Sequence, residues 1–246
     1  MNDVLTLERE PLFVNVIDRI AHLADIHIPK NHKRHPEYKE VFMRLIDQLR
    51  QQKPERIVIV GDLYHDKLNI SNEAKILAAD LLNMLAEIAP VRITRGNHDF
   101  DIHKNHQRMD CIQALVELIR NPRIEYYNQS GFFQDENLIF VVWHHGDHYS
   151  PWNELEKPRE ERVKGFYDEE INTLLAWFGS VENMKNKKGA FEPSVFTFVD
   201  LYHDPVKGCR AANGMVMEKD SYLSVHDFQG DLAMLGDIHQ RDFFTK

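Results

Sequence analysis

Side chains that bind divalent metal ions occur in five short motifs along the chain, each at the end of an apolar run. Their members are carboxylates, imidazoles and one amide: Asp25, His27, Asp62, Asn97, His203, Asp237 and His239. A single Asp-x-His motif is more often a turn or a solvated surface pair than a metal site, and a single histidine is no stronger a signal. The ordered series is much less common, and it predicts a metal centre.

The number and the types of these side chains indicate two ions. Seven ligands are too many for one ion that is four- to six-coordinate, whereas a carboxylate can bridge two ions. Oxygen and nitrogen ligands without a thiolate suit Mn²⁺ best, with Mg²⁺, Fe²⁺ and Zn²⁺ as alternatives. Two ions about 3.5–4 Å apart can clamp an in-line phosphoryl displacement and lower the pKa of an attacking water. The leaving oxygen then needs a proton, which a histidine outside the ligand set can donate.

The elements around the motifs are predicted to bring them together. Apolar runs at 20–24, 56–60, 91–94, 195–202 and 232–235 are typical of strands, and helical spacing marks residues 36–52, 71–88 and 108–120. Their alternation predicts an α/β domain, and α/β folds bind ligands at the carboxyl ends of their strands. After residue 124, turn residues separate short apolar runs, which predicts β-hairpins in a second half of the sheet.

Composition limits the class of protein. The 246 residues suit one domain, 1–246, with a charged surface insertion at about 150–190. A net charge of −9 argues against a protein that binds nucleic acid through overall positive charge, but it does not exclude a nuclease. Two cysteines make no disulfide framework and favour a reducing, cytoplasmic location. We find no secretory signal and no apolar stretch of the roughly 18–20 residues that span a bilayer.

The order of the motifs resembles the signature of the calcineurin-like metallophosphoesterases. That signature is Asp-x-His, Gly-Asp, Gly-Asn-His-Asp, a single His and Gly-x-x-His. The neighbouring residues are similar to the double-strand-break-repair nuclease branch, which includes SbcD-like and phage recombination endonuclease subunits; these segments are 61–65, 202–208 and 235–240. The resemblance spans about residues 20–240 and implies an α/β fold, a β-sandwich flanked by helices.

The resemblance implies a role for each motif residue. The first metal ion would be held by Asp25, His27 and His239, and the second by Asn97, His203 and Asp237, with Asp62 bridging the two. His98 would contact the scissile phosphate and protonate the leaving group, with Asp99 orienting it, and His65 would help to position the phosphate.

The chain departs from the family at two places. Asp237 stands where the family usually has histidine, which should leave a competent site with an altered metal preference. The chain also stops at Lys246, where the family continues into a cap domain that grips DNA and a segment that binds an ATPase. We therefore expect a C-terminally truncated catalytic domain. The resemblance further implies DNA and an SbcC-like ATPase subunit as partners, a homodimer through helices 71–88 and 108–120, and, for a phage protein, a location in the host cytoplasm.

The predicted function is a two-metal phosphodiesterase that hydrolyses DNA, as an exonuclease or endonuclease in recombination or repair. One alternative is a phosphoesterase of the same fold that acts on small molecules or phosphoproteins. Another is a non-catalytic scaffold, which should have lost ligands or the proton donor; this chain keeps all of them.

Overall fold

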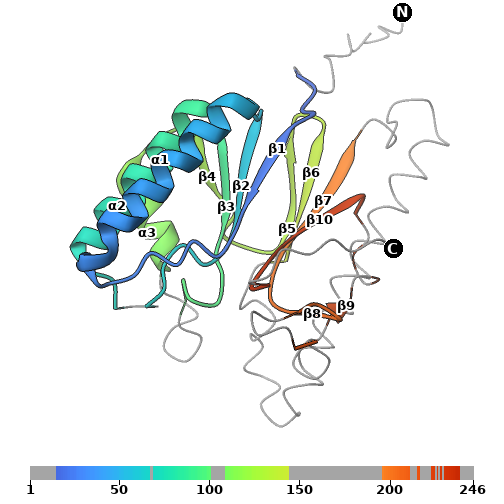
Figure 1. The fold of residues 1–246 in the computed structure, drawn as a ribbon. Coiled ribbons are helices and arrows are strands. Elements are labelled where there is room, and N and C mark those ends of the chain that lie inside the picture. The colour runs from blue at the N-terminus through green and yellow to red at the C-terminus, as the bar shows by residue number, and fades with distance from the viewer. Residues whose placement is uncertain are drawn as a thin grey trace, which may run out of the picture.

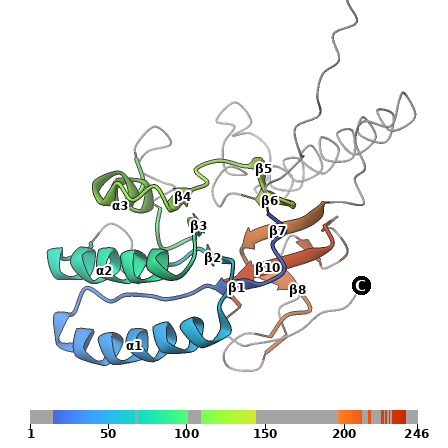
Figure 2. The same cartoon turned by 90° about the horizontal axis from the view of Figure 1, so that it is seen from above.

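The computed structural model describes most of the two halves of the chain that flank the predicted insertion. The described residues are 15–66, 69–100, 109–143, 196–210, 215–216, 223–224, 226, 228 and 230–238. Their elements form three layers, with helices on one side, a first sheet in the middle and a second sheet on the other side (Figures 1 and 2). The predicted insertion at 150–190 lies outside the described residues.

The first sheet contains four parallel strands in the order β1-β2-β3-β4. Their bounds are β1 Ile20–Leu23, β2 Arg56–Val60, β3 Val91–Thr94 and β4 Ile124–Tyr126. Because the strands are parallel, their carboxyl ends lie at one edge of the sheet, the lower edge in Figure 1. This confirms the expected placement of the first three motifs.

Three α-helices cover one face of the first sheet: α1 His35–Gln52, α2 Asn72–Ile88 and α3 Cys111–Ile119. A 3-10 turn, η1 His32–Arg34, precedes α1. The side chain of Ser71 caps α2 by accepting the N–H of Ala74, as predicted. The prediction for α3 began too early, because Asp110 caps this helix by accepting the N–H of Gln113.

The second sheet has the order β10-β7-β6-β5. Its strands are β5 Gly131–Asp135, β6 Leu138–Trp143, β7 Thr197–His203 and β10 Leu232–Gly236. A parallel pair, β8 Val206–Lys207 and β9 Leu223–Ser224, lies beside it. The β5–β6 pair is the predicted hairpin, whereas β6, β7 and β10 pair in parallel.

The hairpin prediction is wrong for the turn before β5. The strand before that turn, β4, pairs with β3 in the first sheet, and the strand after it pairs with β6 in the second sheet. The turn residues 128–131 therefore carry the chain from one sheet to the other. Turn chemistry marks a change of direction, but it does not specify which strand is the partner.

Strand β2 contributes to two hydrophobic cores. Ile57 and Ile59 pack with the helices, whereas Val58 and Val60 pack against the second sheet. All four side chains are fully buried, which explains the unbroken apolar run. This packing fixes the end of β2, and with it the position of the motif that follows.

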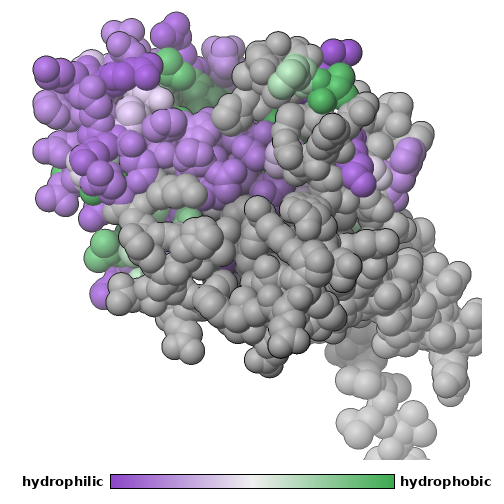
Figure 3. Space-filling view, turned by 90° about the horizontal axis from the view of Figure 1, so that it is seen from below, coloured by the Kyte–Doolittle hydropathy of each residue, from purple (hydrophilic) through white to green (hydrophobic). Residues whose placement is uncertain are grey.

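Hydrophilic residues predominate among the described atoms that are visible from below (Figure 3). Within the described part of the chain, no helix has the length and apolar character needed to cross a membrane.

Candidate metal centre

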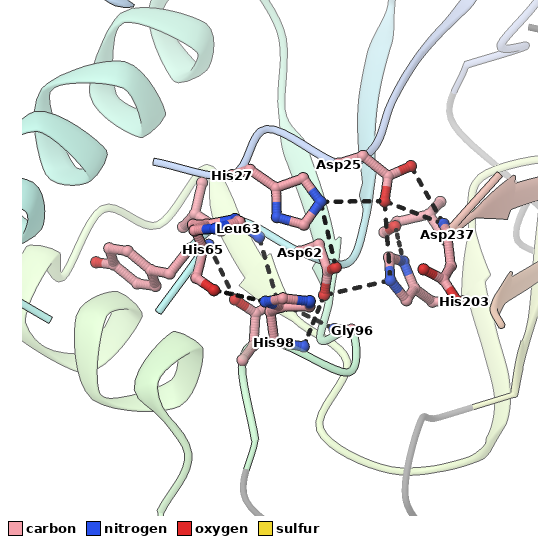
Figure 4. A network of polar contacts seen from close by, with 12 residues as sticks. Asp25, His27, Asp62, Leu63, His65, Gly96, His98, His203 and Asp237 are labelled. Atoms are coloured by element: carbon pink, nitrogen blue, oxygen red, sulfur yellow. Dashed lines mark hydrogen bonds and ion pairs between the residues drawn. The ribbon is translucent and has the colours of Figure 1, made fainter. Parts of the chain in front are cut away.

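Seven of the predicted site residues meet at the carboxyl edge of the two sheets (Figure 4), and Asn97 lies in the loop that carries His98. They come from the loops after β1, β2 and β3, from the last residue of β7 and from the residue after β10: Asp25, His27, Asp62, His65, Asn97, His98, His203 and Asp237. Segments more than 200 positions apart in sequence touch here, since the N–H of Asp237 donates to both carboxylate oxygens of Asp25 at 3.1 Å. The predicted ligand His239 lies outside the described residues.

Four of these residues form a group that we call the carboxylate cluster: Asp25, Asp62, His203 and Asp237. Each offers a ligand atom, and these atoms lie within 4.8 Å of one another. Nε2 of His203 is 3.2 Å from Oδ1 of Asp62 and 3.9 Å from Oδ1 of Asp25. The structure thus gathers into one group residues that the resemblance divides between two ions, with Asp62 as the predicted bridge.

Three histidines form a second group, the histidine cluster: His27, His65 and His98. Their ligand atoms also lie within 4.8 Å of one another. His27 lies between the two clusters, because its Nε2 is 3.5 Å from Oδ2 of Asp62 and 3.9 Å from Oδ1 of Asp25. Asn97 lies half-buried beside His98 in the β3 loop.

The backbone is strained at the candidate ligands. Among the described residues other than glycine, positive φ angles occur at Asp25, His27, Asp62 and Asp237, with values of 53°, 50°, 53° and 60°. The remaining instances are Lys53, Arg120 and Glu136, which end α1, end α3 and form the β5–β6 turn. Left-handed backbone is unusual outside glycine and tends to occur at functional sites. Here every instance outside a cap or turn is a candidate ligand.

Asp62 is fully buried, yet it is charged. Burial opposes its ionisation, but the adjacent imidazole of His203 and the N–H of His98 outweigh that cost and lower the pKa of Asp62 to about 2. Oδ1 accepts the N–H of His98 at 2.8 Å. Oδ2 is buried and has no hydrogen-bond partner among the described residues. A buried carboxylate oxygen in this state is costly unless a cation binds it.

His203 is oriented by the backbone of β2. Its Nδ1 donates to the carbonyl oxygen of Val60 at 2.6 Å, which directs Nε2 towards the carboxylates. Burial disfavours the charged ring, but Asp62 and Asp25 outweigh it and raise the pKa of His203 to about 10. Nε2 is itself buried without a hydrogen-bond partner among the described residues. With Oδ2 of Asp62, it gives two buried atoms without a hydrogen-bond partner among the described residues, and both are of types that bind divalent metal ions once the ring has released its proton, so these residues fit such an ion.

Glycines in the motifs leave room for the ligands. A Cβ atom placed on Gly61, Gly96 or Gly236 would collide with the ring of His203 or the carboxylate of Asp62. The glycines of the Gly-Asp, Gly-Asn-His-Asp and Gly-x-x-His motifs are therefore needed because the backbone packs closely against the side chains of Asp62 and His203.

Asp99 has a different role from the predicted one. Its buried carboxylate accepts the N–H groups of Leu63, Tyr64 and Gly96 at 3.0–3.2 Å, so it joins the β2 loop to the β3 loop. The ring of His98 is instead oriented by a backbone carbonyl, since its Nδ1 donates to the oxygen of His65 at 2.5 Å. This arrangement leaves Nε2 of His98 as the ring atom that can meet a substrate.

Two residues make contacts that support the loops and were not expected from sequence. The hydroxyl of Tyr38 on α1 donates to the carbonyl of His27 at 2.9 Å. Arg95 pairs with the buried Asp110 at 3.2 Å and lies over the ring of Phe100 at 3.9 Å. No sequence signal marks Tyr38, because its position in a predicted helix indicates only packing. Arg95 could have been identified, because it is a charged residue between a strand and a glycine motif.

The sequence matches one family model and is similar to several known proteins. The calcineurin-like phosphoesterase family model matches residues 18–241. An uncharacterised protein of Acanthamoeba polyphaga mimivirus is 30% identical over 94% of this chain and 15% of its own length. The DNA double-strand break repair protein Mre11 of Methanopyrus kandleri is 28% identical over 65% of this chain and 37% of its own length. The DNA double-strand break repair protein Mre11 of Methanococcus maripaludis is 25% identical over 91% of this chain and 52% of its own length.

The chain thus spans about half or less of the length of each of these relatives. Among solved structures, the Pseudomonas putida nuclease MPE matches half of this chain and 51% of its own, at 19% identity and a TM-score of 0.31. The family match covers all the strands of both sheets and every motif that the site uses. The chain belongs to the calcineurin-like phosphoesterases.

Proposed function

We propose that this protein is a two-metal phosphodiesterase that hydrolyses DNA. The observation that carries the proposal is the state of Asp62. It is fully buried and ionised, it has one oxygen without a hydrogen bond among the described residues, and it lies between His203 and His27. A bridging ligand of two cations would need these properties.

The proposed ligand sets follow from the positions around Asp62. The first ion would be held by Asp25, His27 and His239, and the second by Asn97, His203 and Asp237. Burial and the neighbouring carboxylates raise the pKa of Asp237, so a bound cation would favour its charged form. Because oxygen ligands predominate in this set, we propose Mn²⁺ as the ion.

The remaining chemistry is assigned to two histidines. Bound divalent ions would supply charge stabilisation and a water of lowered pKa. His98 would protonate the leaving oxygen through Nε2, since its Nδ1 is fixed on the carbonyl of His65. His65, which is exposed beside it, would position the phosphate.

The proposal of DNA as the substrate is supported by two relatives that are DNA double-strand break repair proteins. The same resemblance leads us to propose an SbcC-like ATPase as a partner. We further propose a cytoplasmic location, which for a phage protein would be the cytoplasm of the host. We also propose a homodimer through α2 and α3. These helices contact each other and carry exposed Ile76 and Leu118, which are 61% and 79% exposed. Sedimentation of a strict monomer at high concentration would exclude the dimer.

The test compares two substrates under Mn²⁺: linear double-stranded DNA and the chromogenic diester bis(p-nitrophenyl) phosphate. We expect both to be hydrolysed, and His98→Ala to lose DNA cleavage while it retains Mn²⁺ binding. Hydrolysis of the small diester without any cleavage of DNA would favour a phosphoesterase for small molecules or phosphoproteins. A His98→Ala variant with full activity would refute the assignment of the proton donor.

A further inference from the structure

The histidine cluster presents a ligand set that is chemically distinct from the carboxylate cluster. His27, His65 and His98 offer only imidazole nitrogens, whereas the carboxylate cluster offers three carboxylates and one imidazole. Hard ions such as Mn²⁺ and Mg²⁺ prefer oxygen ligands, and Zn²⁺ accepts three imidazoles with an open fourth position. The two groups are therefore suited to different ions.

The three rings are spaced as one bound ion requires. Their centroids are 5.0 Å apart for His27 and His98, 5.3 Å for His27 and His65 and 5.5 Å for His65 and His98. A tetrahedral ion with Zn–N distances of about 2.0–2.1 Å holds ring centroids roughly 5 Å apart. The ligand atoms, which lie within 4.8 Å of one another, must approach to roughly 3.4 Å. His65 is exposed, so this approach needs side-chain rotation and no change in the sheets.

One ring of the cluster is also pre-oriented. Nδ1 of His98 is engaged by the carbonyl of His65, which fixes the ring and leaves Nε2 for a metal ion. Metal-binding histidines commonly have their second nitrogen held by a backbone carbonyl in this way. His27 is anchored through its own carbonyl, which accepts the hydroxyl of Tyr38.

We propose that the histidine cluster binds Zn²⁺ and that this binding inhibits the enzyme. The inhibitory part rests on the proposed function. A zinc ion held by this cluster would take His98 away from the leaving group and His65 away from the phosphate. It would also compete for His27, whose Nε2 faces Asp62 and Asp25 at 3.5 and 3.9 Å. Zinc would thus block the reaction without displacing the carboxylate ligands.

The experiment measures zinc binding directly, without DNA. The full chain is equilibrated with saturating Mn²⁺ and increasing Zn²⁺, and bound metals are counted after equilibrium dialysis. We expect one Zn²⁺ per chain, and at least about tenfold weaker binding in His65→Gln, because a lost ligand should cost no less than a lost supporting contact. His98→Gln is a second ligand variant, and His226→Gln, at an exposed position outside the cluster, is the matched control that should bind zinc as the wild type does.

Inhibition of DNA cleavage by Zn²⁺ is measured in parallel. His65→Gln should need at least about tenfold more zinc for half-inhibition of its remaining activity. Unchanged zinc binding in both His65→Gln and His98→Gln would overturn the proposal, as would zinc that releases Mn²⁺ in equal amount whether or not His65 is present. Zinc binding that depends on His65 in a protein without nuclease activity would support the site and refute only the proposed function.

Discussion

Two buried aspartates lie near opposite ends of strand β2, and their negative charges are balanced in different ways. Asp135, at the end of β5, accepts three hydrogen bonds from arginine side chains. Two come from Nε and Nη2 of Arg56, at 2.7 and 2.6 Å, and one comes from Nε of Arg92, at 2.8 Å. Arg56 and Arg92 lie near the amino ends of β2 and β3, whereas Asp62 follows the carboxyl end of β2. Asp62 faces histidines and other carboxylates, and its Oδ2 has no hydrogen bond among the described residues.

The difference separates a structural carboxylate from a functional one. The charge of Asp135 is balanced by two arginines from the other sheet, so it ties the sheets together without any added ion. The carboxylate cluster combines three carboxylates with one imidazole, which leaves an excess of negative charge that divalent ions would balance. A substitution of Asp62 should therefore impair catalysis, whereas a substitution of Asp135 should lower the free energy of unfolding.

The largest effect is expected from Asp62→Asn, which removes the proposed bridge. Metal ions supply several kcal/mol of transition-state stabilisation, so DNA cleavage under Mn²⁺ should fall roughly a thousandfold. The Mn²⁺-induced rise in Tm should also disappear, while the metal-free variant remains folded. DNA cleavage and Tm with and without Mn²⁺ check this. A variant that Mn²⁺ stabilises as strongly as the wild type would show that Asp62 is not a metal ligand.

The next effect is expected from Asp135→Ala, at the other end of the strands. Loss of this carboxylate leaves the mostly buried Arg56 without its carboxylate partner and Arg92 with only the exposed Glu125, and breaking such a buried pair costs about 3–5 kcal/mol in the free energy of unfolding. Urea unfolding without Mn²⁺ measures it, and Mn²⁺ affinity should be unchanged at a temperature where the variant is folded. Glu87→Gln is the control, because its pair with Arg50 is exposed and should contribute little. An equal loss in both variants would contradict the structural role of Asp135.

The site around Asp62 and the ion pairs of Asp135 were not equally predictable from sequence. The carboxyl-edge site follows from local patterns: each ligand comes at the end of an apolar run, and parallel strands bring such ends together. The strands β2 and β3 were predicted with their observed bounds, and α2 with its observed end and its Ser71 cap. Asp135, by contrast, looks like a turn residue in sequence, because its partners Arg56 and Arg92 are 79 and 43 positions away on another sheet.

The same limit explains the details of the site that sequence reasoning missed. The pairing of β4 with β3, and not with β5, depends on packing against α3 and on the register of two sheets. Asp99 binds backbone N–H groups 35 and 36 positions away, which no motif encodes. The gathering of His27 with His65 and His98 likewise depends on the positions of three loops, so residue types predicted a centre but not its division into two clusters.

A smaller effect is expected from low pH, which should remove the contribution of Asp135 to stability. Burial alone would raise the pKa of Asp135, but Arg56 and Arg92 outweigh it and hold that pKa below its usual range. A depressed folded-state pKa contributes stability above the unfolded-state value of about 3.9, and this stability is lost as the pH falls through the folded-state value. Metal-free Tm values for the wild type and Asp135→Asn should therefore differ at pH 7, and the difference should shrink progressively below about pH 4. The difference begins to shrink near pH 4 and closes only below the folded-state pKa, so a gap as wide at pH 3 as at pH 7 would mean that the arginines do not act through the charge of Asp135.

The smallest effect is expected where a neutral hydrogen bond supports the site. Tyr38→Phe removes the donor to the carbonyl of His27 and keeps the aromatic packing against Phe42. Such a bond contributes about 0.5–1.5 kcal/mol, so the free energy of unfolding should fall by about 1 kcal/mol. Mn²⁺ affinity should fall only slightly, because the ligand atoms themselves are kept. Urea unfolding and Mn²⁺ titration measure both quantities. A loss of affinity as large as that of Asp62→Asn would mean that the strained β1 loop, and not the charge of the carboxylates, determines metal binding at this end of the sheet.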